Sequence, residues 1–257
     1  MSTMPASHGH NEACCNIPPI VSDDYVAKGL YEELGNYKSY VTGPADAKKG
    51  IIVIYDIFGY FHQTLQGADI LATGNINQQH KVFIPDWFKG KPCPIEWMPP
   101  DTEEKQKNLG GFFSDPEHAP QTIVSKLPQY VKSVLALNPS IESWALLGYC
   151  WGGKVASLME SDESSIFQIA AACHPAMLDP AEANSIKVPF ILLASGEEPA
   201  DKVAEFGNKL KVRHHVETFG DQVHGWMAAR GDLTNPRVKE EYARGYQTVL
   251  DFFSKNW

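Results

Sequence analysis

The feature that most constrains this chain is a regular alternation of short apolar runs with longer segments of helical periodicity. Short runs rich in Val, Ile, Leu and Ala are typical of strands buried on both faces. The alternation therefore predicts a mainly parallel central sheet flanked by helices on both faces. We expect strands at residues 37–41, 51–55, 81–85, 144–149, 167–173, 190–195 and 214–219, and helices at 64–75, 121–137, 153–161, 201–210 and 237–255.

The chain has 257 residues, which we interpret as a single α/β domain, because sheets of this kind form one core at this length. Residues 89–120 hold many prolines, glycines and charges and show no sustained period. Such a long segment is uncommon in a compact domain unless it is functional, so both a lid over a pocket and a plain surface loop stay open. We expect residues 1–20 to form a loosely ordered N-terminal extension.

The net charge limits the possible partners. A formal charge of -9 argues against nucleic acid, because phosphate binding needs clustered Lys and Arg. No apolar stretch approaches the roughly 18 residues of a membrane helix, and residues 1–16 lack the apolar core of a signal peptide. We expect a soluble, cytoplasmic protein that acts on a small molecule, with no nucleic acid and no membrane as partner. A monomer and a weak dimer both fit the sequence.

The cysteines do not form the pattern of a secreted disulfide framework, because their number is odd and their spacing irregular. They are Cys14, Cys15, Cys93, Cys150 and Cys173. At least one thiol is therefore left for chemistry. The pair Cys14-Cys15 lies near His8 and His10 but lacks the ligand spacing of zinc modules, so we expect no metal.

Residues 148–153 read Gly-Tyr-Cys-Trp-Gly-Gly and stand between an expected strand and an expected helix. A nucleophile on such a sharp strand-to-helix turn sits in a strained backbone, and flanking glycines make room where a Cβ would collide. The turn aims the backbone N–H of Trp151 toward the oxygen of an attacked carbonyl. We interpret Cys150 as the nucleophile; the alternative is a small buried cysteine that packs a tight turn.

A cysteine nucleophile needs a base, and His224 is the best placed histidine. It follows the last expected strand and a turn at Gly220-Asp221, which is where α/β-hydrolases carry their catalytic histidine. His214 and His215 are weaker candidates, because consecutive strand residues point to opposite faces.

The acid of such a triad comes after the preceding strand, where three carboxylates stand. They are Glu197, Glu198 and Asp201. We favour Glu198, just beyond the strand end, with Asp201 second. The alternative is that all three are solvated carboxylates at the start of a helix, where the helix dipole favours negative charge.

Four segments in this order resemble one family. They are "YDIFG", "IPDWFKGKP", "GYCWGG" and "VHGWMAARGD", and together they span residues 55–232. They resemble the dienelactone hydrolase (carboxymethylenebutenolidase) family. The resemblance implies an α/β-hydrolase fold, a Cys-His-acid triad, hydrolysis of cyclic enol esters or related esters, and no metal or organic cofactor. It places Glu198 at the triad acid, where family members more often carry Asp.

The resemblance also implies residues around the triad. Asp56 corresponds to an acidic residue, usually Glu, that interacts with the resting nucleophile; alternatively, it caps a loop. Ile57 would supply the second N–H of the oxyanion hole.

Basic residues hold a substrate carboxylate in the family. Arg230 is the closest counterpart, and Lys89 or Lys91 would replace another; ordinary surface cations are the alternative. Trp151 and Trp226 would wall the pocket, or else belong to the core.

The predicted mechanism is attack by Cys150 on an ester carbonyl, with His224 as base, followed by hydrolysis of a thioester. Two other functions stay open on the same residues. One is a general carboxylesterase or thioesterase, because the fold does not set the leaving group. The other is a redox-sensing homologue in which Cys150 is a reactive thiol without efficient turnover.

Overall fold

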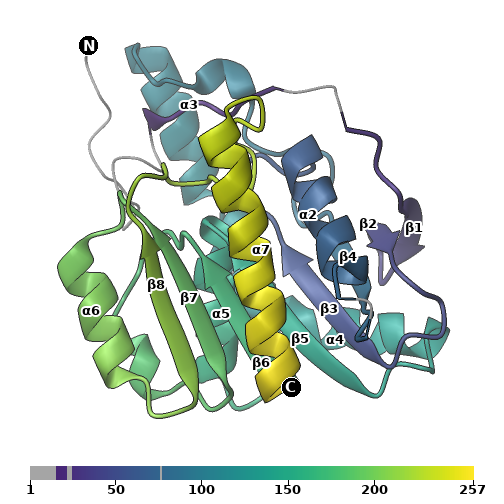
Figure 1. Cartoon of the computed structure of the whole chain (residues 1–257). Helices are drawn as coiled ribbons and strands as arrows, with labels where there is room; N and C mark the ends of the chain where they lie inside the picture. The colour runs from purple at the N-terminus through teal and green to yellow at the C-terminus, as the bar shows by residue number, and fades with distance from the viewer. Residues whose placement is uncertain (1–15, 22–24, 76) are drawn as a thin grey trace.

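Strand β5 (Ser143–Tyr149), which leads into Cys150, runs through the inner part of an eight-stranded sheet (Figure 1). The computed structural model describes residues 16–21, 25–75 and 77–257. All residues of β5 after the first are buried, and β3 (Lys49–Ile54) and β6 (Ile169–Cys173) pair with it in parallel. The continuous apolar runs therefore form strands with both faces in the core.

The sheet has the order β1-β2-β4-β3-β5-β6-β7-β8. Strands β3 to β8 are parallel, and β1 and β2 are antiparallel at one edge. This confirms the mainly parallel sheet. The remaining bounds are β1 (Leu30–Leu34), β2 (Tyr37–Thr42), β4 (Lys81–Pro85), β7 (Phe190–Ser195) and β8 (His214–Phe219).

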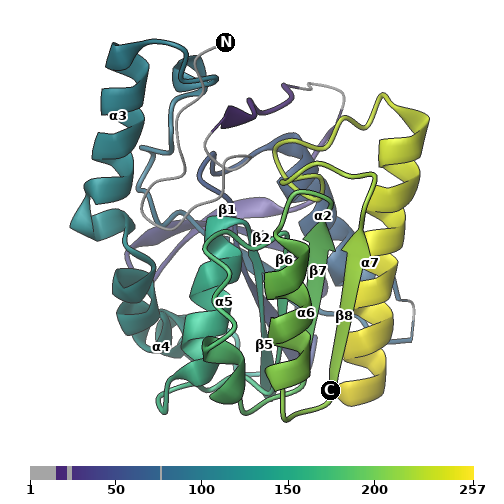
Figure 2. The ribbon, with the colours of Figure 1, turned by 90° about the vertical axis from the view of Figure 1, so that its left-hand side faces the viewer.

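Helices cover both faces of the sheet, as Figures 1 and 2 show. One face carries α2 (His62–Thr73) and α7 (Pro236–Asn256), and the other carries α4 (Pro120–Leu137), α5 (Trp151–Ser161) and α6 (Ala200–Lys209). In α7 the buried Tyr242, Tyr246, Val249 and Phe253 recur at helical spacing and form the face toward the sheet. The helical layers predicted from periodicity are confirmed.

Several elements were not expected from the sequence. Strand β1 is an edge strand with four exposed residues, so it lacks an alternating pattern. Residues 89–120, for which the sequence predicted no helix, contain the helix α3 (Glu103–Ser114) and the short turns η1 (Ile95–Trp97) and η2 (Pro116–His118). Helix α3 buries only two residues, too few for a recognisable period, and Thr102 caps it by accepting a hydrogen bond from the Lys105 N–H.

The carboxyl ends of the parallel strands meet at one edge of the sheet, and the loops that follow them carry the candidate residues. Asp56 follows β3, Cys150 follows β5, Glu198 follows β7 and His224 follows β8. This edge is where α/β folds place their sites. Helix α3 stands beyond it (Figure 2).

Candidate active site

Cys150 lies on the bend between β5 and α5 with φ 53° and ψ -113°, a left-handed conformation that is strained for a side-chain-bearing residue. The residues two positions before and after it, Gly148 and Gly152, leave no room for a side chain. A Cβ at Gly148 would lie 1.9 Å from the carbonyl oxygen of Gly152, and a Cβ at Gly152 would lie 2.2 Å from that of Ile54. The close approach of these backbones is thus the reason for the glycines around Cys150.

His224 and Glu198 form a buried pair. The Nδ1 atom of His224 lies 2.6 Å from Oε1 of Glu198, and both side chains are fully buried. Glu198 also accepts hydrogen bonds from the backbone N–H and the hydroxyl of Ser195, the last residue of β7. The carboxylate is therefore held by its own strand end while it holds the imidazole.

The other two carboxylates have different places. Glu197 accepts a hydrogen bond from the backbone N–H of His224 at 2.5 Å, so it anchors the loop and not the ring. Asp201 lies exposed in the first turn of α6. Of the three, only Glu198 contacts the ring of His224 among the described contacts.

Cys150 and His224 interact directly. Burial lowers the pKa of His224, but the charge of Cys150, its hydrogen bond to the imidazole and the contact with Glu198 outweigh burial and raise that pKa. Since Nδ1 is engaged by Glu198, Nε2 is the nitrogen available to the sulfur. These contacts favour the positively charged imidazole. An imidazolium beside a cysteine is one of the features that lower the pKa of a thiol and activate it as a nucleophile.

Asp56 is buried beside this pair. Its Oδ1 accepts from the Phe58 N–H at 2.9 Å and its Oδ2 from the Ala229 N–H at 3.1 Å. Burial and the charge of Cys150 raise its pKa to about 6, against the opposing effect of Arg230 and these two N–H groups. Asp56 thus ties the loop after β3 to the loop that carries His224.

The segments that lead to Ile57 and away from Trp151 approach each other at the same edge. Gly152, next to Trp151, approaches the carbonyl oxygens of Ile54 and Tyr55, just before Ile57. Trp151 is the first residue of α5, and the first N–H groups of a helix have no partner within it. The indole of Trp151 donates to the carbonyl of His118 at 2.8 Å, so its ring is fixed by the segment 89–120.

Arg230 is also brought to this place. Its guanidinium lies 5.0 Å from the ring centroid of Phe58, and its Nε donates to the carbonyl of Ile17 at 2.6 Å. It is 2% exposed. The charge of Arg230 acts on the pKa of Asp56. A buried arginine of this kind is uncommon, because charged side chains are rarely buried unless they are paired.

The structure does not bring Lys89, Lys91 or Trp226 to Cys150 in any described contact. Lys89 is exposed, with its ammonium 5.5 Å from the ring centroid of Tyr37, and Lys91 is exposed as well. Trp226 is buried, its ring centroid 4.4 Å from that of Phe219, and a Cβ at Gly245 in α7 would lie 2.4 Å from it. Its ring also lies edge to face with the ring of His174, at a centroid distance of 6.5 Å.

The site is closed in this structure, because Cys150 and His224 are both 0% exposed. Residues 16–21 contribute to the cover: the Ile20 N–H donates to the carbonyl of Ala229 at 2.8 Å, next to the bond between Ile17 and Arg230. The segment 89–120 contributes through Cys93, whose N–H donates to the carbonyl of Ile57 at 2.8 Å. The lid function of that segment remains a prediction.

The sequence analysis missed His174, which follows β6 at the same edge and has φ 38°. Its ring centroid lies 5.4 Å from that of His224, at an interplanar angle of 71°. The available signal was its position: it directly follows an apolar run that stands between the nucleophile strand and the acid strand.

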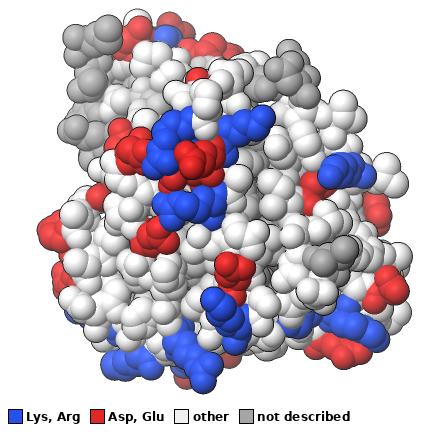
Figure 3. Space-filling model, viewed as in Figure 1, with Lys and Arg blue, Asp and Glu red and all other residues white. Residues whose placement is uncertain are grey.

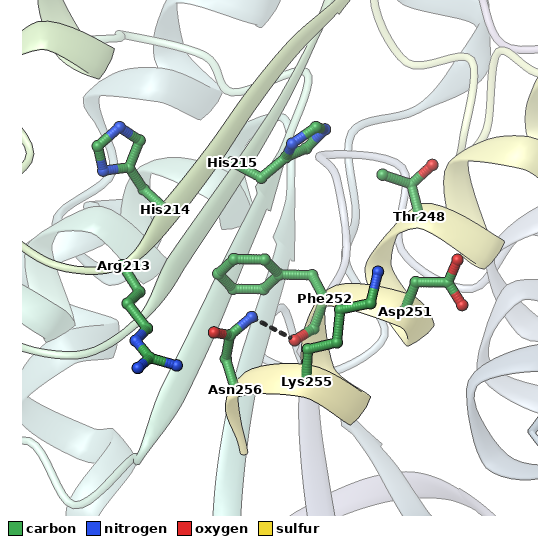
Figure 4. Close-up of a pocket in the computed structure, with 8 residues that line it drawn as sticks. All are labelled: Arg213, His214, His215, Thr248, Asp251, Phe252, Lys255 and Asn256. Carbon is green, nitrogen blue, oxygen red and sulfur yellow. Dashed lines mark hydrogen bonds between the residues drawn. The ribbon is translucent and has the colours of Figure 1, made fainter.

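A hollow of about 460 Å³ lies at the amino end of β8, beside the last turns of α7 (Figure 4). Cys150 lies at the carboxyl ends of the strands, so this hollow is at the opposite end of the strands from the candidate triad. Arg213, His214, His215 and Lys255 line it among others. His214 and His215 therefore lie away from the nucleophile.

The charges on the face seen in Figure 3 are mixed. Basic and acidic side chains alternate over the first half of α7, where Arg237 and Arg244 pair with acidic neighbours on α7, β8 and the loop after β8. This face presents no continuous basic stripe of the kind that binds nucleic acid.

Among residues 16–21, 25–75 and 77–257, no three His, Cys, Asp or Glu side chains gather closely enough to hold a metal ion. The pair Cys14-Cys15, with His8 and His10, lies outside the described residues. No helix of the described chain has the length and apolar character needed to cross a membrane.

Comparisons with known proteins identify the family and the fold. Residues 37–256 match the dienelactone hydrolase family. An AIM2 family protein of Schizosaccharomyces pombe is 36% identical over 235 residues, covering 89% of this chain and 92% of that protein. A carboxymethylenebutenolidase homolog of Rattus norvegicus is 25% identical over 244 residues, covering 90% and 93%.

Solved structures show the same fold at low identity. A dienelactone hydrolase from Anabaena variabilis has a TM-score of 0.62 at 12% identity and covers 90% of this chain and 98% of its own. An enol-lactonase from Burkholderia xenovorans has a TM-score of 0.55 at 11% identity, covering 88% and 100%. The fold is that of the α/β-hydrolases, and the chain belongs to the dienelactone hydrolase family.

Proposed function

We propose that this protein hydrolyses an ester or lactone of a small molecule through a triad of Cys150, His224 and Glu198. The observation that carries the proposal is the continuous contact from Glu198 to His224 to Cys150 in a buried place. A carboxylate on Nδ1 sets the tautomer of the imidazole and stabilises its positive form.

In the first half of the reaction, His224 takes the thiol proton and the sulfur of Cys150 attacks the ester carbonyl. The oxyanion is held by the N–H groups of Ile57 and Trp151, each of which is typically worth about 3 kcal/mol of transition-state stabilisation. The C–O bond then breaks, and the alcohol leaves with the proton from His224. In the second half, water hydrolyses the thioester.

Arg230 favours a substrate that carries a carboxylate, because it is a cation buried close to the nucleophile. A general carboxylesterase or thioesterase would lack this preference. A lactone bearing a carboxylate and a neutral aryl ester, compared by kcat/KM, separate the two activities. We expect the former to be preferred, and Arg230→Gln to remove most of the preference.

The mechanism requires Cys150 to remain a thiol, which a reducing compartment such as the cytoplasm provides. The three cysteines among the described residues, Cys93, Cys150 and Cys173, are all free and buried. A redox sensor would keep the same thiol but turn over no ester.

The test is the release of nitrophenol from a nitrophenyl ester. Cys150→Ser and His224→Ala should each lose nearly all turnover while far-UV circular dichroism stays that of the wild type. Cys93→Ala is the matched control, because Cys93 is also a buried thiol, with a pKa raised to about 12 by burial. Wild-type turnover in Cys150→Ser, or no turnover in the wild-type protein, would overturn the proposal.

A further inference from the structure

His174 is held against the nucleophile by backbone contacts on both sides of it. The Cys150 N–H donates to the carbonyl of Cys173 at 3.1 Å, and the Ala176 N–H donates to the carbonyl of Cys150 at 2.9 Å. The segment 173–176 therefore clasps the nucleophile, and His174 is the side chain within that clasp that carries hydrogen-bonding nitrogens.

The ring of His174 lies between the catalytic imidazole and the aromatic ring that precedes Cys150. It lies edge to face with His224 and is stacked on Tyr149, at an interplanar angle of 21° and a centroid distance of 5.8 Å. Tyr149 is itself held by a 2.7 Å hydrogen bond between its hydroxyl and that of Tyr246. The contacts with Tyr149 and His224 therefore hold the ring of His174 in place beside His224.

His174 is uncharged in this place. Burial lowers its pKa well below the usual value, and the positive charges of His224 and Arg230 lower it further. A neutral imidazole has one N–H donor and one nitrogen acceptor.

Within the part of the chain that the structure describes, neither ring nitrogen of His174 has a hydrogen-bond partner on another residue, although the side chain is 0% exposed. A buried polar group without a partner costs about 1–3 kcal/mol. An apolar ring would pack against Tyr149 without that cost. The imidazole is therefore better explained by polar atoms that are present during the reaction.

We propose that His174 is a catalytic residue of the second half-reaction, where its ring holds the water that hydrolyses the thioester. The inference rests on the proposed function of Cys150 and His224. A water that bridges two nitrogens through hydrogen bonds of about 2.9 Å spans about 4 to 5 Å. The ring centroids of His174 and His224 lie 5.4 Å apart, close to that span.

The water oxygen forms a bond to the thioester carbonyl carbon while Nε2 of His224 takes one water proton. The tetrahedral intermediate then breaks its C–S bond, the electron pair returns to Cys150 as thiolate, and the acid product leaves. The acceptor nitrogen of His174 binds the second O–H of the water and takes no proton, so the thiolate–imidazolium pair is restored.

The experiment compares His174→Asn with His174→Leu, two side chains of similar size of which only the first keeps a donor and an acceptor. With nitrophenyl acetate, rapid mixing separates the burst of acylation from the steady-state rate. We expect His174→Leu to keep the burst rate within about twofold and to lose about ten- to a hundredfold in the steady state. His174→Asn should recover most of that loss, because Asn binds water and tolerates the left-handed backbone.

Two further measurements sharpen the result. Intact-protein mass should show that His174→Leu accumulates a single acetyl group that depends on Cys150, and hydroxylamine, which replaces water as the nucleophile, should release it. His80→Leu is the control for losing a buried histidine: His80 is 1% exposed, also has a ring nitrogen without a partner among the described residues, and stacks on Trp257 away from the site. It should keep both phases.

The outcomes are distinct. Wild-type steady-state turnover in His174→Leu, or equal losses in acylation and deacylation, overturns the inference. If the Leu variant does not fold, His174→Phe takes its place as the apolar variant and is judged in the same way. A burst that persists in Cys150→Ala would instead overturn the proposed function.

Discussion

The Nδ1 atom of His224 lies 2.6 Å from Oε1 of Glu198, and neither side chain is exposed to solvent. Burial alone would keep His224 neutral. The two flanking groups, Glu198 and Cys150, reverse that preference. The contact with Glu198, which follows β7, therefore helps to keep His224 positively charged beside the sulfur of Cys150, which follows β5.

Loss of the Glu198 carboxylate should disable His224. We expect Glu198→Gln to lower kcat/KM on a nitrophenyl ester by about 10²- to 10⁴-fold, because the imidazolium loses its counter-charge and its fixed tautomer. Glu198→Asp, one methylene shorter, should retain part of the activity. Asp201→Asn is the comparison and should keep near wild-type activity. A large loss in Asp201→Asn with little loss in Glu198→Gln would identify Asp201 as the acid.

The thiolate–imidazolium pair should be visible in the alkylation of Cys150. Because the pKa of His224 is raised to about 10, the imidazole stays positively charged beside the sulfur across neutral pH and loses its proton as pH rises through that value. We expect the iodoacetamide rate of the wild-type protein to vary little between about pH 6.5 and 9. In His224→Ala the rate should rise with pH as for an ordinary thiol, with a pKa near 8.5. Identical profiles would show that the two groups are not coupled.

Asp56 should make the protein less stable as pH rises. Its folded pKa of about 6 lies above the usual 3.8, so its contribution is complete below pH 3.8 and is lost as pH rises through 6. The shift corresponds to about 3 kcal/mol. Melting temperatures of wild type and Asp56→Asn, measured from pH 4 to 8, should therefore change in favour of the variant as pH rises. A constant difference over that range would contradict the raised pKa.

The bend at Cys150 should tolerate no side chain at its glycines. Gly152→Ala should abolish folding or reduce stability severely, because the new Cβ would meet the Ile54 carbonyl, which cannot move without breaking the sheet. Gly110→Ala in α3 is the control, since nothing lies within 4 Å of its Cβ position. It should stabilise the protein by about 0.5–1 kcal/mol. Chemical denaturation measures both, and a folded Gly152→Ala of wild-type stability would refute the close approach.

Several features followed from local sequence alone. The continuous apolar run of β5 could only be a strand buried on both faces, and a glycine-flanked cysteine after it could only stand on a tight bend. The order of β5, β7 and β8 then placed Cys150, the acid and His224 at one edge. Helix α3 and strand β1 were not predicted, because each buries too few side chains to produce a recognisable hydrophobic periodicity in the sequence.

The sequence by itself determined the type of sheet, the bend at Cys150 and the edge at which the candidate residues meet, because each depends on a local pattern or on chain order. Only the tertiary structure decided which carboxylate contacts the ring of His224, that Trp226 packs between β8 and α7, and that His174 lies beside the imidazole of His224. Glu197, Glu198 and Asp201 stand within five positions of one another. Which of them contacts His224 depends on side-chain directions that are set when separate loops pack together.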